Sequence, residues 1–443
     1  MFNEAIFMTT SPPHRDSASS VGIGLLGCGT VGEGVARLLL SHAEDYRARV
    51  GRPVRLRRVA VRTLDRSRGL DAHHLTLDAE SVVDDPETHI VVEVMGGCEP
   101  ARTLILRAIA HGKHVVTANK EVIARHGDEI YAAAREHGVA VFIEGTAGGG
   151  IPLIMPLKAS LAANRIRRIS GIINGTTNYI LSAMSLAGQG FDEALAEAQR
   201  LGFAEADPAA DVEGFDAVYK MAILAATFFA HRVRVDDVYR EGITHLTAAD
   251  IRYARELGYA IKLLGVASQE AGRLMVRVHP ALVARSHPLA HVNGAMNAIA
   301  VQGDAVGEVM FSGPGAGQLP TASAVLGDVL NLAADLDHPN RLMICQHTES
   351  GPVAPIDDLV TRFYLRLIAH DRPGVIGAIG NAFARFGVSI RSMVQHDERD
   401  NLAEIVIVTH RVQESAMRGA LADVAEHPTI QAIASVVRVE DLG

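Results

Sequence analysis

The chain is poor in cysteine and in aromatic residues. Its 443 residues include three cysteines, no tryptophan and only 5% aromatic residues. Cys28, Cys98 and Cys345 lie far apart and form no C-x-x-C pair, so neither a zinc site nor a disulfide framework is predicted. Because such sparse cysteine usage fits a reducing compartment, we expect the protein in the cytoplasm.

Two further absences exclude whole classes of protein. No apolar run reaches the roughly 18 residues that a membrane-spanning helix needs. The net charge is −9 and no block of lysine and arginine occurs, which argues against nucleic acid and anionic membranes as partners. Residues 1–20 lack the order of a signal peptide and are predicted to be a flexible extension. The rest, with 48% hydrophobic residues over the chain, is long enough for two or three domains.

Residues 21–150 alternate apolar strand patterns with helical patterns. The predicted strands are 21–26, 54–61, 90–94, 113–118 and 139–143, and the predicted helices include 35–41, 102–111 and 128–137. Such alternation is typical of βαβ units and a parallel sheet. We therefore predict an α/β fold in which this part is a Rossmann-type nucleotide-binding domain.

A glycine-rich loop follows the first strand at once. Gly27-Cys-Gly-Thr-Val-Gly32 matches G-x-G-x-x-G in the strand–loop–helix context that the motif requires. Its glycines allow a tight turn and close approach of a pyrophosphate to the helix N-terminus. Arg62 stands where the second strand ends, and an arginine there suits the 2′-phosphate of NADP. The sequence thus favours NADP, with a solvated Arg62 and NAD as the alternative.

The pattern changes after residue 150. We predict an α+β catalytic and dimerisation domain over 151–311, which includes a helix at 152–163 and a polar turn at 174–178. A second glycine-rich stretch and a helix follow, and about 312–345 is expected to complete the nucleotide-binding domain. Residues 346–360 are predicted to be a linker. Residues 361–443 follow a βαββαβ order, which is typical of a small α+β sandwich of ferredoxin type.

The most informative segment runs from Leu201 to Lys220. It places five carboxylates ahead of one lysine that opens an apolar helix. Asp216 and Lys220 are four residues apart and share a helix face. A lysine in an apolar helix needs a charged partner or a shifted pKa, and either condition suits proton transfer. A structural ion pair at the start of a core helix explains the same pattern, so this segment alone leaves both interpretations open.

Several motifs, taken in order, resemble the homoserine dehydrogenase family. They are Gly27 to Gly32, Ala118-Asn-Lys120, Glu144-Gly-Thr-Ala-Gly-Gly-Gly-Ile-Pro152, Gly171 to Leu181, and Leu201 to Lys220. The tail, with Asp371-Arg-Pro-Gly-Val375, resembles an ACT regulatory domain. No kinase region precedes the matched part, so we expect the monofunctional form. The resemblance implies reversible NAD(P)H-dependent reduction of L-aspartate 4-semialdehyde to L-homoserine, a step toward threonine, methionine and isoleucine.

The resemblance also implies roles for individual residues. Lys220 is expected to act as general acid and base, Lys120 to assist beside the nicotinamide, and Asp216 to orient Lys220. The expected substrate-binding residues are Glu205, Asp211, Gly175 and Thr176. The expected cofactor-binding residues are Gly27, Gly29, Thr30, Val31, Gly32, Arg62, Gly96, Lys120, Gly315 and Gly317. The expected sodium ligands are Glu144, Ala147, Gly149 and Ile151, and backbone carbonyls among them suit a hard cation.

Elementary chemistry agrees with the roles of the two lysines. Hydride transfer to an aldehyde creates alkoxide character on oxygen, which a nearby ammonium stabilises and protonates. One rival, an aspartate-semialdehyde dehydrogenase, needs an activated cysteine nucleophile, and none of the three cysteines has an activating sequence context. The other rival is a sensor that binds a nucleotide and an amino acid without turnover. Such a sensor has no need for a general acid.

The ACT-like tail predicts feedback control. We expect a pathway amino acid, threonine first, to bind near Asp371 to Val375, where a Pro-Gly turn before a helix leaves backbone amides for a carboxylate. A tail that only pairs with a second copy through a sheet edge is the alternative. The resemblance implies a homodimer or a homotetramer.

Overall fold

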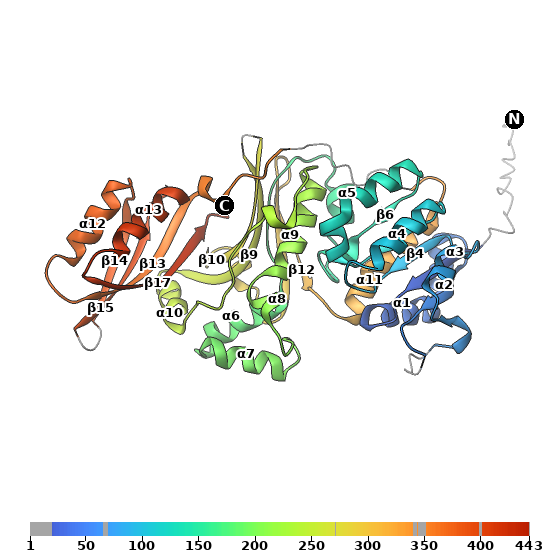
Figure 1. Ribbon diagram of the computed structural model, residues 1–443, viewed down its shortest axis with the longest axis horizontal. Coiled ribbons are helices and arrows are strands. Elements are labelled where there is room, and N and C mark those ends of the chain that lie inside the picture. Colours follow the sequence, from blue (N-terminus) through green and yellow to red (C-terminus); the bar gives the residue numbers. More distant parts are fainter. Residues whose placement is uncertain are drawn as a thin grey trace, which may run out of the picture.

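Three bodies follow one another along an elongated molecule (Figure 1). The computed structural model describes residues 20–64, 70–270, 272–339, 343, 351–397 and 401–442. The nucleotide-binding body and the C-terminal body lie at opposite ends, and a body built on a mixed sheet lies between them (Figure 1). The predicted extension except Ser20, together with Cys345 and residues 346–350 of the predicted linker, lies outside the described residues.

A six-stranded parallel sheet forms the core of the N-terminal body. Its strand order is β3-β2-β1-β4-β5-β6. The strands are β1 (Val21–Leu26), β2 (Val54–Ala60), β3 (Leu75–Thr76), β4 (Ile90–Glu93), β5 (His114–Thr117) and β6 (Val141–Phe142). Every residue of β1, β4 and β5 is buried, as expected for parallel strands covered on both faces. The predicted Rossmann-type fold is confirmed.

The helices of this body include one that returns from far along the chain. They are α1 (Thr30–Ser41), α2 (Ala43–Val50), α3 (Ala79–Asp84), α4 (Ala101–Ala110), α5 (Lys120–Glu136) and α11 (Gln318–Ala334). α11 packs against α1, α2, β4 and β5. A Cβ on Gly34 of α1 would lie 2.9 Å from the carbonyl oxygen of Gln318, so the close approach of α1 and α11 requires glycine there.

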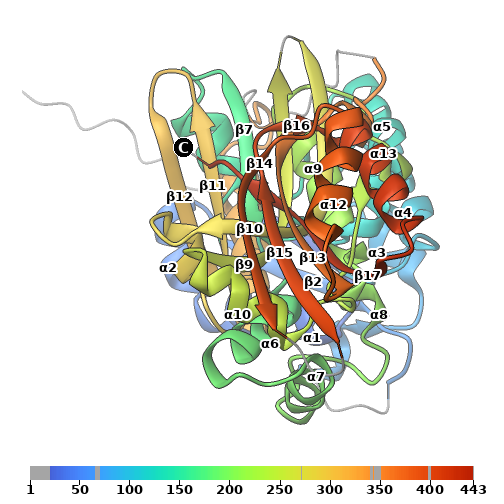
Figure 2. The same ribbon diagram turned by 90° about the vertical axis from the view of Figure 1, so that its left-hand side faces the viewer.

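A second sheet, of eleven strands, runs through the middle and C-terminal bodies. Its main path is β12-β11-β7-β9-β10-β17-β13-β15-β14, with β8 on β10 and β16 on β13. The strands are β7 (Ile166–Ile172), β8 (Tyr239–Arg240), β9 (Tyr259–Glu270), β10 (Arg273–Ala284), β11 (Met296–Gly303), β12 (Gly307–Pro314), β13 (Val360–His370), β14 (Ile390–Asp397), β15 (Leu402–Thr409), β16 (Val412–Gln413) and β17 (Ile430–Glu440). Pairing of β10 with β17 joins the two bodies (Figure 2).

Helices complete both bodies. In the middle body they are α6 (Gly175–Ala187), α7 (Phe191–Arg200), α8 (Ala209–Val212), α9 (Phe215–Phe228) and α10 (Ala248–Glu256). In the C-terminal body they are α12 (Val375–Arg385) and α13 (Glu414–Ala425). α9 is apolar and packs against β9 and β10. The C-terminal order β13-α12-β14-β15-α13-β17 confirms the predicted βαββαβ unit, with the short β16 added.

Three predicted element boundaries are wrong. The helix predicted at 128–137 begins at Lys120, and the polar turn predicted at 174–178 is the start of α6. In both cases an asparagine before the helix caps it: the side chain of Asn119 accepts from the amide of Val122, and that of Asn174 from the amide of Thr177. The helix predicted at 152–163 is reduced mainly to a π-helical turn, Pro156–Ser160.

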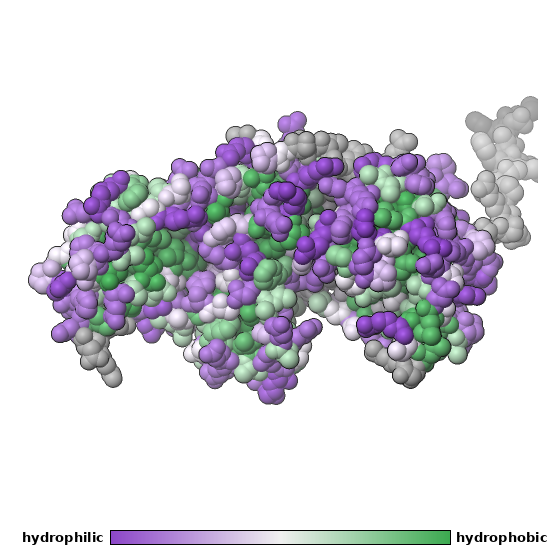
Figure 3. Space-filling view, viewed as in Figure 1, coloured by the Kyte–Doolittle hydropathy of each residue, from purple (hydrophilic) through white to green (hydrophobic). Residues whose placement is uncertain are grey.

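The surface is mixed in polarity. On the face shown, hydrophobic residues lie in separate groups among hydrophilic ones (Figure 3). Within the described ranges, no helix combines the length and the apolar character that crossing a membrane demands.

Candidate active site

Two helices from different bodies bring two lysines to one carboxylate. Lys120 is the first residue of α5, whereas Asp216 and Lys220 lie in the first turns of α9. Lys220 Nζ donates to Asp216 Oδ2 at 2.8 Å and to the carbonyl oxygen of Ile173 at 2.8 Å. Lys120 Nζ donates to Asp216 Oδ1. Asp216 therefore bridges the nucleotide-binding body and the middle body.

The charges of this cluster stabilise one another. Burial raises the pKa of Asp216, but the ammonium groups of Lys220 and Lys120 outweigh burial and hold that pKa far below its usual range. Burial lowers the pKa of Lys120, but the Asp216 carboxylate raises it further, so the net pKa is raised. Asp216 and Lys220 are each less than a tenth exposed. The cluster is thus a buried carboxylate shared by two cations.

Asn174 joins a second acid to the cluster. Its Nδ2 donates to Asp211 Oδ1 at 2.6 Å and to Asp216 Oδ2 at 2.9 Å, while its Oδ1 caps α6. The structure therefore brings together four of the predicted site residues through Asn174, a residue that was placed only in the predicted turn. An asparagine directly before a helical pattern is a capping signal that identifies such a position in a sequence.

The remaining predicted substrate-binding residues lie at the edge of the cluster. Gly175 and Thr176 begin α6, and Thr176 Oγ1 donates to the carbonyl oxygen of Phe203 at 2.6 Å. Glu205 is exposed, and its carboxylate makes no hydrogen bond or ion pair within the described part of the chain. It is free to meet a cationic ligand.

The glycine loop has the geometry of an anion-binding turn. Gly27 has φ +99°, and a Cβ on Gly32 would lie 2.1 Å from the carbonyl oxygen of Gly27, so neither position tolerates a side chain. Gly29 has no atom within 4 Å of an added Cβ. Thr30 and Val31 begin α1, and no side-chain hydrogen bond caps that helix in the described structure. Open space before an uncapped helix fits a pyrophosphate.

Further predicted cofactor positions flank this turn. Arg62 follows β2 and is exposed, and Gly96 follows β4 with φ +79°. Because β2 and β4 pair with β1 on either side, both positions lie at the edge of the sheet where the glycine loop lies. Gly315 and Gly317 lie between β12 and α11, and a Cβ on Gly149 would lie 2.2 Å from the carbonyl oxygen of Gly315. The loop that holds Gly149 is therefore in contact with the segment from Gly315 to Gly317.

A buried network at the end of β4 was not predicted. Glu93 Oε2 accepts from Thr117 Oγ1 at 2.7 Å, and Glu93 Oε1 accepts from Asn119 Nδ2 at 3.3 Å. Asn119 Nδ2 also donates to the carbonyl oxygen of Gly97 at 2.8 Å, while Asn119 Oδ1 caps α5. Burial raises the pKa of Glu93. The network fixes the start of α5, and with it Lys120.

In the loop predicted to hold a cation, the Glu144 side chain binds backbone amides. Glu144 Oε1 accepts from the amides of Leu153 at 2.5 Å and Ile154 at 2.8 Å, and Oε2 accepts from the amide of Met155 at 2.7 Å. Burial raises the pKa of Glu144. Both carboxylate oxygens of Glu144 therefore accept from backbone amides of the segment from Leu153 to Met155.

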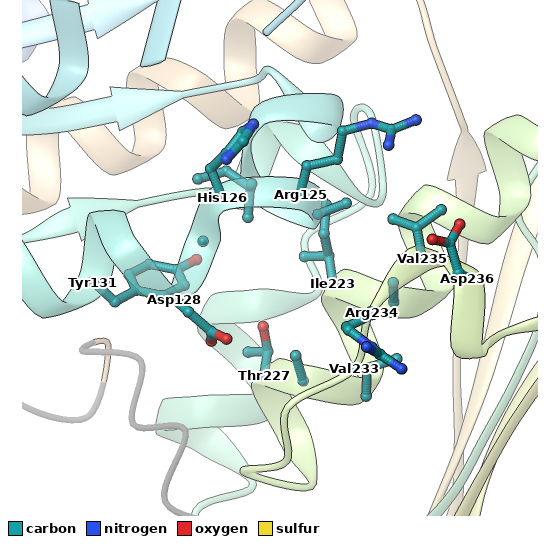
Figure 4. A pocket seen from close by; sticks show the side chains of 15 residues that line it. Arg125, His126, Asp128, Tyr131, Ile223, Thr227, Val233, Arg234, Val235 and Asp236 are labelled. Carbon is teal, nitrogen blue, oxygen red and sulfur yellow. The ribbon is translucent and has the colours of Figure 1, made fainter. Parts of the chain in front are cut away.

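A separate cavity of about 390 Å³ lies between α5 and α9 (Figure 4). Arg125 and His126 of α5, Thr227 of α9, and Arg234 and Asp236 beyond α9 line it. None of the predicted site residues is among its lining residues. This cavity is therefore separate from the cluster around Asp216.

The fold and the site together define a nicotinamide-dependent oxidoreductase: a parallel sheet with an anion-binding glycine loop, beside a lysine–carboxylate cluster. Family models match three segments. They are the homoserine dehydrogenase NAD-binding domain over residues 27–144, homoserine dehydrogenase over 152–330, and the ACT domain over 363–427.

Curated relatives and solved structures agree over nearly the whole chain. Homoserine dehydrogenase of a Synechocystis strain is 51% identical and covers 95% of this chain and 99% of its own, and that of Corynebacterium glutamicum is 42% identical, covering 97% of each. The crystal structure of a homoserine dehydrogenase from Thiobacillus denitrificans is 45% identical with a TM-score of 0.91, and covers 96% of this chain and 99% of its own. The chain belongs to the homoserine dehydrogenase family. It is an NAD(P)-dependent oxidoreductase that interconverts L-aspartate 4-semialdehyde and L-homoserine.

Proposed function

We propose that the Lys120–Asp216–Lys220 cluster carries the proton transfer of this reaction. The observation that supports the proposal is the Asp216 carboxylate held between two ammonium groups from two bodies. The nicotinamide, when bound, supplies or accepts the hydride. As the aldehyde is reduced, negative charge develops on its oxygen, and Lys220 stabilises that charge and donates the proton. In the reverse direction the amine of Lys220 accepts the hydroxyl proton of homoserine.

Lys120 and Asp216 have distinct supporting roles in this proposal. Asp216 holds the Lys220 ammonium against the carbonyl oxygen of Ile173, which fixes the direction of the proton that Lys220 can deliver. Lys120, at the start of α5, adds a second positive charge on the cofactor side of the cluster. Two ammonium groups around one carboxylate leave a net positive charge, which suits an alkoxide.

The acidic loop before α9 is proposed to bind the substrate ammonium. Glu205 is exposed and unpaired within the described residues, and Asp211 is held by Asn174 beside Asp216. Gly175 and Thr176, at the start of α6, lie next to Asn174 and complete this wall. Placing the ammonium against carboxylates leaves the aldehyde end of the substrate free to face Lys220.

The cofactor is proposed to be NADP. Arg62 is exposed at the edge of the sheet where the glycine loop lies, and an arginine there suits a 2′-phosphate. An archaeal homoserine dehydrogenase mutant solved in complex with NADPH is 28% identical, with a TM-score of 0.63 over 73% of this chain. That protein's cofactor supports the proposal.

A sodium ion is proposed in the loop after β6, with the main-chain carbonyl oxygens of Glu144, Ala147, Gly149 and Ile151 as its ligands. The four residues are buried, and carbonyl oxygens are ligands that a hard monovalent cation accepts. The carboxylate of Glu144 has a structural role, because it accepts hydrogen bonds from backbone amides of the segment from Leu153 to Met155. The ion would stiffen a loop that contacts Gly315.

The ACT domain is proposed to bind threonine near Asp371 to Val375. Gly374 precedes α12 with φ +98°, and no side-chain hydrogen bond caps that helix in the described structure. Free amides at a helix start are suited to the carboxylate of an amino acid. The assembly is proposed to be a homodimer or a homotetramer.

Initial rates of homoserine oxidation with NADP and with NAD, measured in parallel, test the proposal. We expect NADP to be preferred, and Arg62→Gln to lower that preference by about tenfold while leaving turnover with NAD unchanged. Lys220→Met should lower turnover by about 10²–10⁴-fold with either cofactor, whereas Lys158→Met, outside the cluster, should not. A preference for NAD would exclude Arg62 as a phosphate ligand. Undiminished turnover in Lys220→Met would exclude the proposed chemistry.

A further inference from the structure

The loop that carries Glu205 is bonded to the start of α6 on both sides of that residue. On one side, Thr176 Oγ1 donates to the carbonyl oxygen of Phe203 at 2.6 Å. On the other side, Asn174 Nδ2 donates to Asp211 Oδ1 at 2.6 Å. Because Asn174 and Thr176 are two residues apart, both ends of the span that holds Glu205 are fixed at one place. α6, α7 and α8 accordingly lie together at the lower edge of the middle body (Figure 1).

Packing of two aromatic rings adds to the first of these bonds. The rings of Phe203 and Tyr179 lie with their centroids 4.8 Å apart, and Tyr179 comes about one turn after Thr176 on α6. Glu205 is two residues beyond Phe203, and two residues of chain span at most about 7 Å. The backbone of Glu205 therefore lies within about 7 Å of a residue that α6 holds by a hydrogen bond and by ring packing.

One side-chain amide holds the main chain at Glu205 itself. Gln199, in the last turn of α7, donates through Nε2 to the carbonyl oxygen of Glu205 at 3.1 Å and to that of Ala206 at 3.4 Å. In the part of the chain that the structure describes, no other hydrogen bond reaches the main chain of Glu205. Because the orientation of a carbonyl is tied to that of its peptide plane, Gln199 restrains the backbone from which the Glu205 side chain extends.

Glu205 is the carboxylate of this loop that is available to a ligand. The other acid of the loop, Asp207, accepts from the amide of Ala209 at 3.1 Å and so is used within the loop. The carboxylate of Glu205 is exposed and makes no hydrogen bond or ion pair among the described residues. An anchored backbone with a free carboxylate is the arrangement expected of a group that binds a cation.

We propose that Gln199 is a positioning residue that directs the Glu205 carboxylate at the ammonium group of the substrate. The proposal rests on the ammonium-binding role proposed above for the acidic loop. A carboxylate that is held in place before binding loses less conformational freedom when the ammonium arrives, so the substrate binds more tightly. The hydroxyl of Thr176 acts on the same loop through Phe203. Both residues therefore act through Glu205 in selecting a substrate that carries an α-ammonium.

A double-mutant cycle between Gln199→Leu and Glu205→Gln in the full chain tests the proposal. Homoserine oxidation at saturating nucleotide gives kcat and the KM for homoserine, and the KM for the nucleotide is measured separately. Gln189→Leu is the matched control, because among the described residues its amide bonds only the exposed side chain of Glu193. Thr176→Val removes the other tie to the loop and takes the place of Gln199→Leu in the cycle if that variant does not fold.

We expect Gln199→Leu to raise the KM for homoserine by about fivefold, with kcat and the KM for the nucleotide changed by less than about twofold. Glu205→Gln should raise the KM for homoserine by about tenfold or more. In the double variant, Gln199→Leu should add no further change, because the carboxylate that Gln199 positions is already absent. Gln189→Leu should behave as the wild type does.

Each contrary result separates this proposal from the one on which it rests. Losses that add up in the double variant would show that Gln199 supports the fold without regard to Glu205, and would overturn the proposal. An unchanged KM for homoserine in Gln199→Leu, together with a raised KM in Glu205→Gln, would overturn it and leave the ammonium-binding role in place. An unchanged KM in Glu205→Gln would remove that role from Glu205, and this proposal with it.

Discussion

At the scale of single residues, Asp216 is the group on which the site depends. Its carboxylate accepts from Lys120 at the start of α5, from Asn174 before α6, and from Lys220 one turn along α9. The two ammonium groups hold the pKa of Asp216 below its usual range, and the Asp216 carboxylate in turn raises the pKa of Lys120. Replacing Asp216 would therefore remove a hydrogen-bond acceptor from both lysines while leaving both side chains in place.

Asp216→Asn is predicted to move the pH dependence of homoserine oxidation. Lys120 is proposed to supply a second positive charge for the alkoxide, and the Asp216 carboxylate raises the pKa of Lys120 against the lowering effect of burial. Without that carboxylate Lys120 loses its proton at lower pH, so the alkaline fall of kcat should shift to lower pH, with kcat reduced by about 10²-fold. Asp207→Asn, an exposed change in the same acidic segment, is the control. An unmoved limb in Asp216→Asn would contradict the assignment.

Lys262 is predicted to make stability depend on pH. It lies in β9, where its Nζ meets only neutral oxygen acceptors of Asn178, Val292 and Asn293 among the described residues, and burial lowers its pKa to about 8. The unfolded chain binds this proton more tightly, since its lysine pKa is about 10.4. The free energy of unfolding should therefore rise by up to about 3 kcal/mol between pH 8 and pH 10.4. Urea unfolding between pH 8 and pH 10.4 should show that rise in the wild type and not in Lys262→Met. If the free energy of unfolding changes equally with pH in the two proteins, the prediction is contradicted.

At the scale of elements, the site is placed by helix starts. α5 begins at Lys120, α6 begins after Asn174, and α9 carries Asp216 in its first turn. Two of these helices are fixed by asparagine caps whose other hydrogen bonds reach into the site. Capping therefore sets both where a helix begins and where a functional side chain lies.

Asn119→Ala is predicted to lower both stability and turnover. It removes the cap of α5 and the bond to the carbonyl oxygen of Gly97, with a loss of about 1–2 kcal/mol in the free energy of unfolding. Because Lys120 is the next residue, kcat should fall by at least about tenfold. Asp78→Ala removes the cap of α3, far from the cluster, and should cost similar stability with unchanged kcat. Equal kcat values in Asn119→Ala and Asp78→Ala would show that the cap of α5 does not contribute to turnover.

The sequence was sufficient for the elements with strong patterns. The nucleotide-binding strands and the ACT unit were predicted because buried parallel strands and alternating strands leave clear hydrophobic patterns. The starts of α5 and α6 were missed because polar residues such as Glu121 and Thr176 read as loop, although tertiary contacts and caps make them helical. The Glu93–Asn119 network could not be predicted, since it joins β4 to the start of α5 across 26 residues.

At the scale of the whole molecule, a buried arginine joins the ACT domain to the middle body. Arg438 of β17 donates to Glu414 of α13 through Nε at 2.7 Å and Nη2 at 2.6 Å. It also donates to Glu241 at 2.7 Å and to the hydroxyl of Tyr239 at 2.9 Å, both next to β10. Burial lowers the pKa of Arg438, but these acids outweigh burial and raise it. One side chain thus ties an ACT helix to the catalytic body.

Arg438→Met is predicted to weaken that connection strongly. It removes the nearer cation of the buried Glu414 and leaves that carboxylate with the exposed Arg418 at 3.8 Å, and breaking such a buried pair costs about 3–5 kcal/mol. Chemical unfolding followed by circular dichroism and by activity should show a large loss of stability, with the ACT domain separating from the rest. Arg385→Met breaks the more exposed pair with Asp423 inside the ACT domain and should cost less than about 1 kcal/mol. Similar losses in the two variants would show that Arg438 does not join the bodies.

The most direct test of the role of Lys220 is chemical rescue of Lys220→Ala by small primary amines. If Lys220 is the general acid and base, amines added to the variant should restore homoserine oxidation in proportion to their concentration, and the restored rate should vary with the pKa of the amine. Lys158→Ala should be fully active and should not respond. A Lys220→Ala protein that folds, binds the nucleotide and gains no activity from any amine would contradict the proposed proton-transfer role of Lys220.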